Sequence, residues 1–358
     1  MSADERYMWR CLELARKGKG AVAPNPMVGA VLVCDAQVVG EGFHAFWGGP
    51  HAEVEAVRSV RDPECLSRAT LYVSLEPCCH FGKTPPCTEL ILQHRIPRVV
   101  VACTDPNPQV GGKGVQRLRE QGCDVTLGVL EKEAREQNRR FFTFQKKKRP
   151  YILLKWAQTL DGFMDIARKS PEDTTSYWIT NGALKLRTHT WRAEEAAIWV
   201  GANTLLHDNP RLNVRYAAGR QPLRIAFFDT SRADIRRFHL ADATQPALVF
   251  HFGEDREEKN LTFCHIPYFN PRPDGLLPAE ALENMLGVLH RRGVVSVMVE
   301  GGRRLLDSLL AAGLWDEARV LEGNIRFGSG LPAPVISQTP VREEAVEDNR
   351  VFYYRNRP

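Results

Sequence analysis

A histidine and two cysteines in the first quarter of the chain have the residue types and spacing of a metal site. His51 lies in PHAEVEA (residues 50–56), and Cys78 and Cys87 lie in EPCCHFGKTPPC (residues 76–87). Imidazole nitrogen and thiolate sulfur together favour zinc. Three protein ligands leave a fourth position for water, which is typical of a catalytic zinc site.

Glu53, two residues after His51, is the expected catalytic residue. The pattern H-x-E followed by P-C-x-x-C is the signature of zinc deaminases, with the glutamate acting as general acid and base outside the ligand set. Eight residues separate Cys78 from Cys87 here, so the short cysteine spacing is not met. Zinc lowers the pKa of a bound water to about 7, and Glu53 could carry the proton to a departing amine.

A closed, structural zinc site is the alternative interpretation. It would need a fourth protein ligand, for which Cys79 and His80 are available. Adjacent Cys78 and Cys79 cannot easily both reach one tetrahedral ion. Cys87 follows two prolines and opens an expected helix, where free N–H groups and the helix dipole favour a thiolate. These points favour the three-ligand site.

Composition limits the classes of protein that the chain can be. With 358 residues, 43% hydrophobic and 25% charged, it is long enough for two globular domains. The formal charge of +5 favours anionic ligands such as phosphates without requiring a polyanion. No apolar stretch is long enough to cross a membrane and no signal peptide is apparent, so we expect a cytoplasmic protein with no membrane partner. Nine cysteines in such a chain indicate thiols and metal ligands rather than disulfides.

Two α/β domains are expected, one on each side of the cationic run KKKRP (residues 146–150). We place the boundary between residues 147 and 148. Residues 1–18 predict an amphipathic helix with Met8, Cys11, Leu12 and Ala15 on one face. Apolar strands alternate with helices before the run (GAVLVCD, ATLYVSLEP, RVVVACTD) and after it (YILLKWAQT, EAAIWVGA, LRIAFFD, ALVFHF, VVSVMVEGG). This alternation favours largely parallel sheets.

The second half has no G-x-G-x-x-G motif, but it has paired glycines between a strand and a helix. VVSVMVEGGRRLLDSLL predicts a strand, a turn at Gly301 and Gly302, and a helix. Such a turn lets backbone N–H groups approach phosphate oxygens.

Longer motifs resemble one enzyme family over nearly the whole chain. PNPMVGAVLV, GPHAEVEA, the PC…GKTPPC spacing and CTDPNPQVGGKG in the first half, with KWAQTLDG, YWIT, VGANTLLHDNPRLNVR and FFDTSR in the second, resemble the bacterial bifunctional riboflavin-biosynthesis deaminase–reductases. The resemblance implies a cytidine-deaminase-like domain (1–147) followed by a dihydrofolate-reductase-like domain (148–358). It also implies zinc in the first domain and NADPH in the second.

For the first domain, the resemblance supplies a substrate and its contacts. The substrate would be 2,5-diamino-6-(ribosylamino)-4(3H)-pyrimidinone 5′-phosphate, whose ring 2-amino group leaves as ammonia. Asn25 and His44 resemble the residues that contact the base. Lys83, Asp105 and Asn107 resemble those that contact the ribose and phosphate, although Lys83 alone could be an exposed loop residue.

For the second domain, the resemblance implies NADPH-dependent reduction of the ribosyl group to a ribityl chain. The residues expected to bind the dinucleotide are Ala157, Trp178, Thr204, Asp208, Thr230, Gly301, Gly302, Arg303, Arg304, Leu305 and Leu306. Those expected to bind the substrate are Lys155, Ser176, Arg192, Leu212, Arg215 and Glu300. Arg192 and Arg215 suit a phosphate through their forked donors, although a surface ion pair is the competing interpretation for each. The chain departs from the family in a longer segment at residues 163–177 and in Asn213, which replaces a threonine.

Specificity for NADPH needs a group that recognises its 2′-phosphate. Arg232, at the end of FFDTSR, could supply it, and a solvated loop position is the competing interpretation.

Two other functions remain open from the sequence. A deaminase of nucleic-acid bases shares the zinc chemistry but predicts aromatic platforms and a broad basic channel. The modest charge and the second α/β domain speak against it, so we expect a small phosphorylated pyrimidine substrate and no nucleic-acid partner. Alternatively, the second domain could be a non-catalytic binding or dimerisation module. We expect the chain to form a homo-oligomer.

Overall fold

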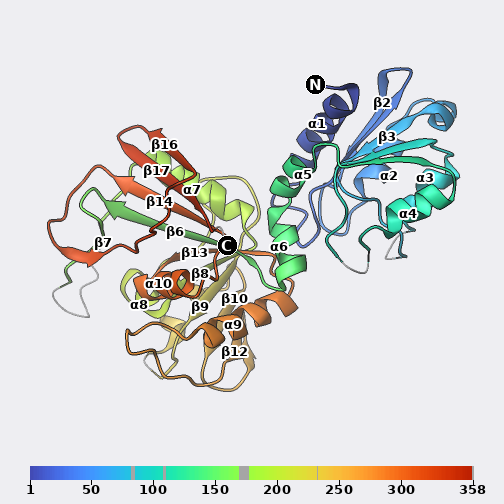
Figure 1. The fold of residues 1–358 in the computed structure, drawn as a ribbon. Coiled ribbons are helices and arrows are strands. Elements are labelled where there is room, and N and C mark those ends of the chain that lie inside the picture. The colour runs from blue at the N-terminus through green and yellow to red at the C-terminus, as the bar shows by residue number, and fades with distance from the viewer. Residues whose placement is uncertain (82–84, 108–109, 169–176, 232, 357–358) are drawn as a thin grey trace. The chain divides into compact units, whose positions relative to one another are not determined.

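Two compact units make up the chain in the computed structural model (Figure 1). They are the N-terminal unit, Met1–Lys148, and the C-terminal unit, Arg149–Pro358. The units therefore meet one residue after the boundary placed from the sequence. The structure describes residues 1–81, 85–107, 110–168, 177–231 and 233–356.

A five-stranded sheet forms the centre of the N-terminal unit (Figure 1). In spatial order its strands are β2 (Gln37–Phe43), β1 (Gly29–Cys34), β3 (Thr70–Val73), β4 (Arg98–Val101) and β5 (Asp124–Leu127). β1 pairs antiparallel with β2 and β3, whereas β3, β4 and β5 are parallel. Because parallel strands end at the same edge of a sheet, the segments that follow β3 and β4 lie close together.

Helices cover both faces of this sheet. They are α1 (Ala3–Arg16), α2 (Ala52–Arg58), α3 (Cys87–Gln93), α4 (Lys113–Glu120), α5 (Glu131–Gln137) and α6 (Arg139–Lys147), with a 3-10 turn at Pro63–Arg68. β1 is buried on both faces because its residues alternate between two cores. Leu32 packs with Ala56 of α2, and Val31 packs with Met8 of α1. The predicted apolar face of the first helix is confirmed, since all four of its residues are buried.

The C-terminal unit is built on a ten-stranded sheet. In spatial order the strands are β11 (Arg256–Glu258), β12 (Leu261–His265), β10 (Ala247–His251), β9 (Leu223–Phe227), β8 (Ala197–Gly201), β13 (Ser296–Gly301), β6 (Tyr151–Thr159), β14 (Glu317–Gly323), β17 (Asn349–Arg355) and β16 (Arg342–Val346). The strands from β12 to β14 are parallel, and β11, β17 and β16 are antiparallel to their neighbours. A second, two-stranded sheet pairs β15 (Gly330–Pro332) with β7 (Phe163–Ile166).

The helices of this unit pack against the parallel strands. They are α7 (Gly182–Glu194), α8 (Ala202–Asp208), α9 (Ala279–Arg291) and α10 (Arg303–Ala311), with 3-10 turns at Ile235–Arg237 and His239–Ala241. The prediction of an α/β fold is thus confirmed for both units.

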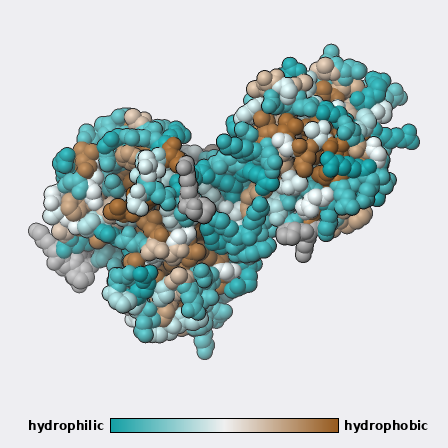
Figure 2. All heavy atoms as spheres, viewed as in Figure 1, coloured by the Kyte–Doolittle hydropathy of each residue, from teal (hydrophilic) through white to brown (hydrophobic). Residues whose placement is uncertain are grey.

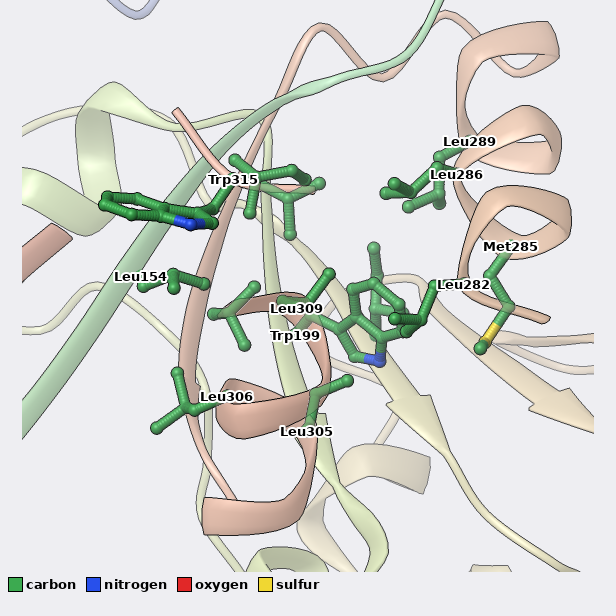
Figure 3. Packing of buried hydrophobic residues seen from close by; sticks show 14 of the residues in the cluster. Leu154, Trp199, Leu282, Met285, Leu286, Leu289, Leu305, Leu306, Leu309 and Trp315 are labelled. Carbon is green, nitrogen blue, oxygen red and sulfur yellow. The ribbon is translucent and has the colours of Figure 1, made fainter. Parts of the chain in front are cut away.

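The largest core of the C-terminal unit holds α10 against the sheet. Figure 3 shows Leu305, Leu306 and Leu309 of α10 packed near Trp199 of β8 and Leu154 of β6. Burying each such side chain contributes roughly 1.5–3 kcal/mol. Apolar packing of α10 against the sheet therefore also fixes the turn between β13 and α10, which carries the paired glycines.

Hydrophilic residues cover most of the visible surface of each unit (Figure 2). Within the described residues, no helix is both long enough and apolar enough to cross a membrane.

Candidate functional sites

The three expected metal ligands come together from separate elements of the N-terminal unit. His51 is the N-cap of α2, Cys78 follows β3, and Cys87 is the first residue of α3. His51 Nδ1 lies 3.3 Å from Cys87 Sγ and 3.6 Å from Cys78 Sγ. The Cys87 N–H donates a hydrogen bond to Cys78 Sγ over 3.3 Å. All three ligand atoms lie within 4.8 Å of one another.

This donor set fits a zinc ion. A hydrogen bond from the Cys87 side chain, with smaller contributions from His51 and the Cys87 N–H, lowers the pKa of the Cys78 thiol to about 4, so a thiolate forms readily. Cys87 lies where the free N–H groups of α3 favour a negative charge. In the part of the chain that the structure describes, the group does not extend to Cys79 or His80. The residues thus suit a three-ligand site better than a closed one.

Glu53 lies in the first turn of α2, outside the ligand group. Its side chain is 4% exposed. Burial raises the pKa of Glu53, and the negative charge of Cys78 raises it further. A carboxyl group that holds a proton nearer to neutral pH can both accept and return one, as general acid–base catalysis requires.

Asn25 and His44 form a hydrogen-bonded pair beside the metal ligands. His44 Nδ1 donates to the Pro50 carbonyl over 2.8 Å, which leaves Nε2 to accept from Asn25 Nδ2 over 3.1 Å. Burial lowers the pKa of His44 and thus favours this neutral form. The ring packs edge-on against His51 at 5.7 Å between centroids. The pair therefore presents a fixed polar edge close to the metal site.

Asp105 and Asn107, expected to contact ribose and phosphate, lie in the segment after β4. The Asn107 N–H donates to Asp105 Oδ1 over 2.7 Å, which forms a tight local turn. Burial raises the pKa of Asp105. Lys83, expected to act with them, lies outside the described residues.

Glu76 is a residue to which the sequence pattern assigned no role. It is 4% exposed and follows the buried end of β3, two residues before Cys78. Its carboxylate accepts four backbone N–H hydrogen bonds from the segment that begins at Asp105. A charged residue in the apolar run VSLEPC was the one signal in the sequence that could have identified it.

A cavity of about 1590 Å³ opens in the C-terminal unit at the ends of its parallel strands. Most of the residues expected to bind dinucleotide or substrate line it: Lys155, Ala157, Trp178, Arg192, Thr204, Asp208, Leu212, Arg215, Glu300, Gly301, Gly302, Arg303, Arg304 and Leu305. The structure therefore brings these fourteen residues, which are spread between Lys155 and Leu305 in the sequence, around one cavity.

Four expected residues are not placed at this cavity. Thr230 is absent from its lining, although Asp229 is part of it. Leu306 is also absent from the lining, and its side chain is fully buried in the core (Figure 3). Ser176 and Arg232 lie outside the described residues.

Paired charges occupy the inner part of the cavity. Arg192 and Glu300 form a bidentate ion pair with both N···O distances 2.5 Å and side chains 12% and 8% exposed. Lys155 lies nearby, and burial lowers its pKa while Glu300 opposes this shift. The ion pair compensates the cost of burying Glu300, which stays ionised and orders the surrounding donors.

His189 was not identified from the sequence. It is 3% exposed, and its Nδ1 accepts a hydrogen bond from the Arg215 N–H over 3.1 Å. Burial, with the neighbouring charges of Arg192 and Arg215, lowers the pKa of His189 to about 4. The neutral ring therefore fixes the backbone of an arginine that lines the cavity.

The paired glycines form the expected turn at the start of α10. Gly301 and Gly302 have φ angles of 148° and 76°, a backbone conformation that favours glycine. A Cβ on Gly302 would lie 3.3 Å from Gly201 Cα and 3.4 Å from Thr204 Oγ1. Two strand ends thus approach closely here, and the free N–H groups of α10 face a site suited to phosphate.

Trp178 and Asp208 line the outer part of the cavity. The Lys185 ammonium lies 4.6 Å from the centre of the Trp178 ring, a cation–π contact. Asp208 lies 3.5 Å from the guanidinium of Arg168, and burial raises the pKa of Asp208. Arg168 also pairs with Asp165 at 2.8 Å.

Comparisons with known families divide the chain in two. Residues 1–103 match the cytidine and deoxycytidylate deaminase zinc-binding region, and residues 150–357 match the RibD C-terminal domain. The riboflavin biosynthesis protein RibD of Aquifex aeolicus is 41% identical over 329 residues, which cover 92% of this chain and 89% of that protein. The RibD protein of Bacillus amyloliquefaciens is 39% identical over 337 residues, with 93% and 88% covered.

Solved structures agree with this division. A diaminohydroxyphosphoribosylaminopyrimidine deaminase/5-amino-6-(5-phosphoribosylamino)uracil reductase from Thermotoga maritima has a TM-score of 0.85 at 36% identity, with 99% of this chain and 98% of that one covered. RibD of Acinetobacter baumannii (form 1) has a TM-score of 0.84 at 32% identity, with 98% of both chains covered.

Proposed function

The chain belongs to the RibD family, the bifunctional deaminase–reductases of riboflavin biosynthesis, and we propose that its two units each carry one of the two activities. The N-terminal unit is the zinc-dependent deaminase, and the C-terminal unit is the NADPH-dependent reductase. The expected order of the two domain types is confirmed by the family matches.

In the first step, the ring 2-amino group of 2,5-diamino-6-(ribosylamino)-4(3H)-pyrimidinone 5′-phosphate leaves as ammonia. His51, Cys78 and Cys87 would hold the zinc ion, which would supply the Lewis acid that makes water nucleophilic at neutral pH. Glu53 accepts a proton from the attacking water and delivers it to the departing amine. The neutral His44 and its partner Asn25 orient the base.

In the second step, the cavity of the C-terminal unit would hold NADPH, which would supply the hydride that reduces the ribosyl group to a ribityl chain. The turn at Gly301 and Gly302 receives a phosphate of the dinucleotide. Arg192 and Arg215 bind the substrate phosphate, while Lys155 and Glu300 hold its sugar in the inner cavity. The donors are already ordered by the ion pair of Arg192 and by the contact between His189 and Arg215.

One observation carries the deaminase assignment. The two cysteine sulfurs and the histidine nitrogen lie within 4.8 Å of one another. The buried Glu53 lies next to them without being one of the ligands. Burying a carboxyl group costs free energy, which a purely structural zinc site would have no reason to spend at that position.

The order of the two steps provides the test. The whole protein with the diamino substrate should release ammonia without NADPH, and should oxidise NADPH only after deamination. Glu53→Gln should block both signals from the diamino substrate. The same variant should oxidise NADPH normally when it receives the deaminated intermediate directly.

The control separates the proposal from its alternatives. Oxidation of NADPH from the diamino substrate by Glu53→Gln would show that reduction does not depend on this deaminase site. A wild-type chain that never oxidises NADPH with the intermediate would make the C-terminal unit a non-catalytic module.

We also propose a cytoplasmic location and a homo-oligomeric state. All nine cysteines are free in the structure, which supports a reducing compartment. Light scattering on the purified chain measures the oligomeric state directly, and a mass of a single 40.4 kDa chain would contradict the second proposal.

A further inference from the structure

Glu76 is a buried carboxylate that neither reaction step above uses. Building on the proposed deaminase function, we propose that Glu76 is a positioning residue, which holds Asp105 and Asn107 in the geometry that binds the ribose phosphate. Its two oxygens accept hydrogen bonds from the backbone N–H groups of Asp105, Gly112, Gly114 and Val115.

Oε2 of Glu76 fixes both ends of the segment that contains Asn107. It accepts from the Asp105 N–H over 3.1 Å and from the Gly112 N–H over 2.9 Å. Between them, the Asn107 carbonyl accepts from the Gly111 N–H over 2.8 Å. Residues 108 and 109 lie outside the described residues. The backbone before and after these two residues is thus hydrogen-bonded to the same oxygen atom of Glu76.

Oε1 of Glu76 holds the first turn of α4. It accepts from the Gly114 N–H over 2.9 Å and from the Val115 N–H over 3.1 Å. The N-cap of α4 is Gly112, which has no side chain to satisfy these donors. A negative charge at a helix start is also favoured by the helix dipole. Glu76 therefore caps α4 from a distant part of the sequence.

Direct backbone contact adds to these hydrogen bonds. A Cβ on Gly114 would lie 2.1 Å from the Pro77 carbonyl oxygen, so α4 packs directly on the residue between Glu76 and Cys78. The ligand Cys78 and the segment with Asn107 are thus anchored at the same point. Glu76 sets the distance between the reacting ring carbon and the phosphate contacts.

Glu76→Gln tests this role with little change in size. The amide NH₂ cannot accept, so two of the four N–H groups lose their partner. We expect the KM of deamination to rise roughly 10- to 100-fold. A change of this size corresponds to the usual free-energy contribution of a hydrogen bond to a charged group. The kcat should change much less, and zinc content and NADPH-dependent reduction of the deaminated intermediate should stay at the wild-type level.

Two comparisons make the test specific. Glu89→Gln is the matched control, because exposed Glu89 joins α3 to α4 through Arg117 at 3.3 Å and contacts neither segment end. It should leave KM unchanged. Asn107→Ala should raise KM, and adding Glu76→Gln to it should raise KM little further, because both changes act on the same contact. Glu76→Asp, which keeps the charge, should recover part of the loss.

The outcomes distinguish this role from a structural one. Loss of zinc, equal falls in kcat and in kcat/KM, failure of Glu76→Gln to fold, or full additivity with Asn107→Ala would each overturn the positioning role. A wild-type protein that releases no ammonia would instead contradict the proposed function itself.

Discussion

The two units build their sites in different ways. In the N-terminal unit, the three ligands and Glu53 lie within residues 51–87, at helix starts and at a strand end. In the C-terminal unit, the cavity is lined by residues that range from Lys155 to Leu331 and come from many strands and helices. A metal site needs only a few atoms at short distances, whereas a cavity for a dinucleotide and a phosphorylated sugar needs an extended surface.

Charge is also handled differently. The N-terminal site relies on the metal to compensate two thiolates, so removal of one ligand should abolish function at once. The C-terminal site compensates charge with its own residues, Arg192 and Glu300, before any ligand binds. We therefore expect a single substitution to abolish activity in the first site but to reduce stability or binding only partly in the second. The following substitutions test this difference, from the largest expected effect to the smallest.

Cys78→Ser should remove the zinc and abolish ammonia release, because a hydroxyl is a poor replacement for a thiolate ligand. Reduction of the deaminated intermediate should continue. Elemental analysis of the purified variant measures the metal directly. Cys79→Ser is the matched control and should keep one zinc per chain; equal loss from both variants would contradict the three-ligand assignment.

Glu53→Gln should lower the rate of ammonia release by roughly 10²–10⁴-fold, the usual contribution of a positioned acid–base group. The amide keeps the size of the side chain but cannot transfer the proton. Zinc content and melting temperature should remain near the wild-type values, since Glu53 is outside the ligand group. Near-normal deamination would assign the proton transfer to another residue.

Arg192→Leu should destabilise the C-terminal unit by about 3–5 kcal/mol, because it leaves Glu300 buried without its partner. Arg149→Leu is the matched control. Arg149 pairs with Asp316 at 2.6 Å, with side chains 11% and 8% exposed, and lies outside the cavity lining. Urea unfolding should show similar losses for both variants, whereas only Arg192→Leu should impair reduction at temperatures where both are folded.

Gly302→Ala should weaken NADPH binding several-fold. The left-handed backbone costs a side chain roughly 1–2 kcal/mol, and the new Cβ would crowd Gly201. Gly313, just after α10, has a φ of 66°, and a Cβ there would meet no atom within 4 Å. Gly313→Ala therefore carries the backbone cost alone and is the matched control. A rise in the KM for NADPH in both variants would show that strain rather than proximity to the ligand is responsible.

His189→Gln should change how stability depends on pH. Burial lowers the pKa of His189 from 6.5 to about 4, so between these values the unfolded chain binds a proton that the folded chain does not. This contribution to stability is therefore present above pH 6.5 and is lost as pH falls toward 4. The stability gap between wild type and variant, measured by urea unfolding, should narrow from about pH 7 to about pH 5 and stay constant at higher pH.

The grouping of the three metal ligands in the N-terminal unit could be predicted from short motifs. His51 and Cys87 lie at helix starts and Cys78 follows a strand, and the fold brings their ligand atoms within 4.8 Å of one another. The prediction for the C-terminal site was less complete. Leu306 follows the paired glycines in sequence, but helical periodicity turns its side chain into the core (Figure 3).

The sequence by itself determined the donor types, the α/β alternation and the glycine turn, because these depend on residue identity and on neighbours within a few positions. Only the tertiary structure decided which polar and charged groups from distant parts of the chain meet. Glu76 and Val115 lie 39 positions apart in the chain, and Arg192 and Glu300 lie 108 apart. Their pairing follows from the order of strands in each sheet, because parallel strands bring the ends of distant segments to one edge.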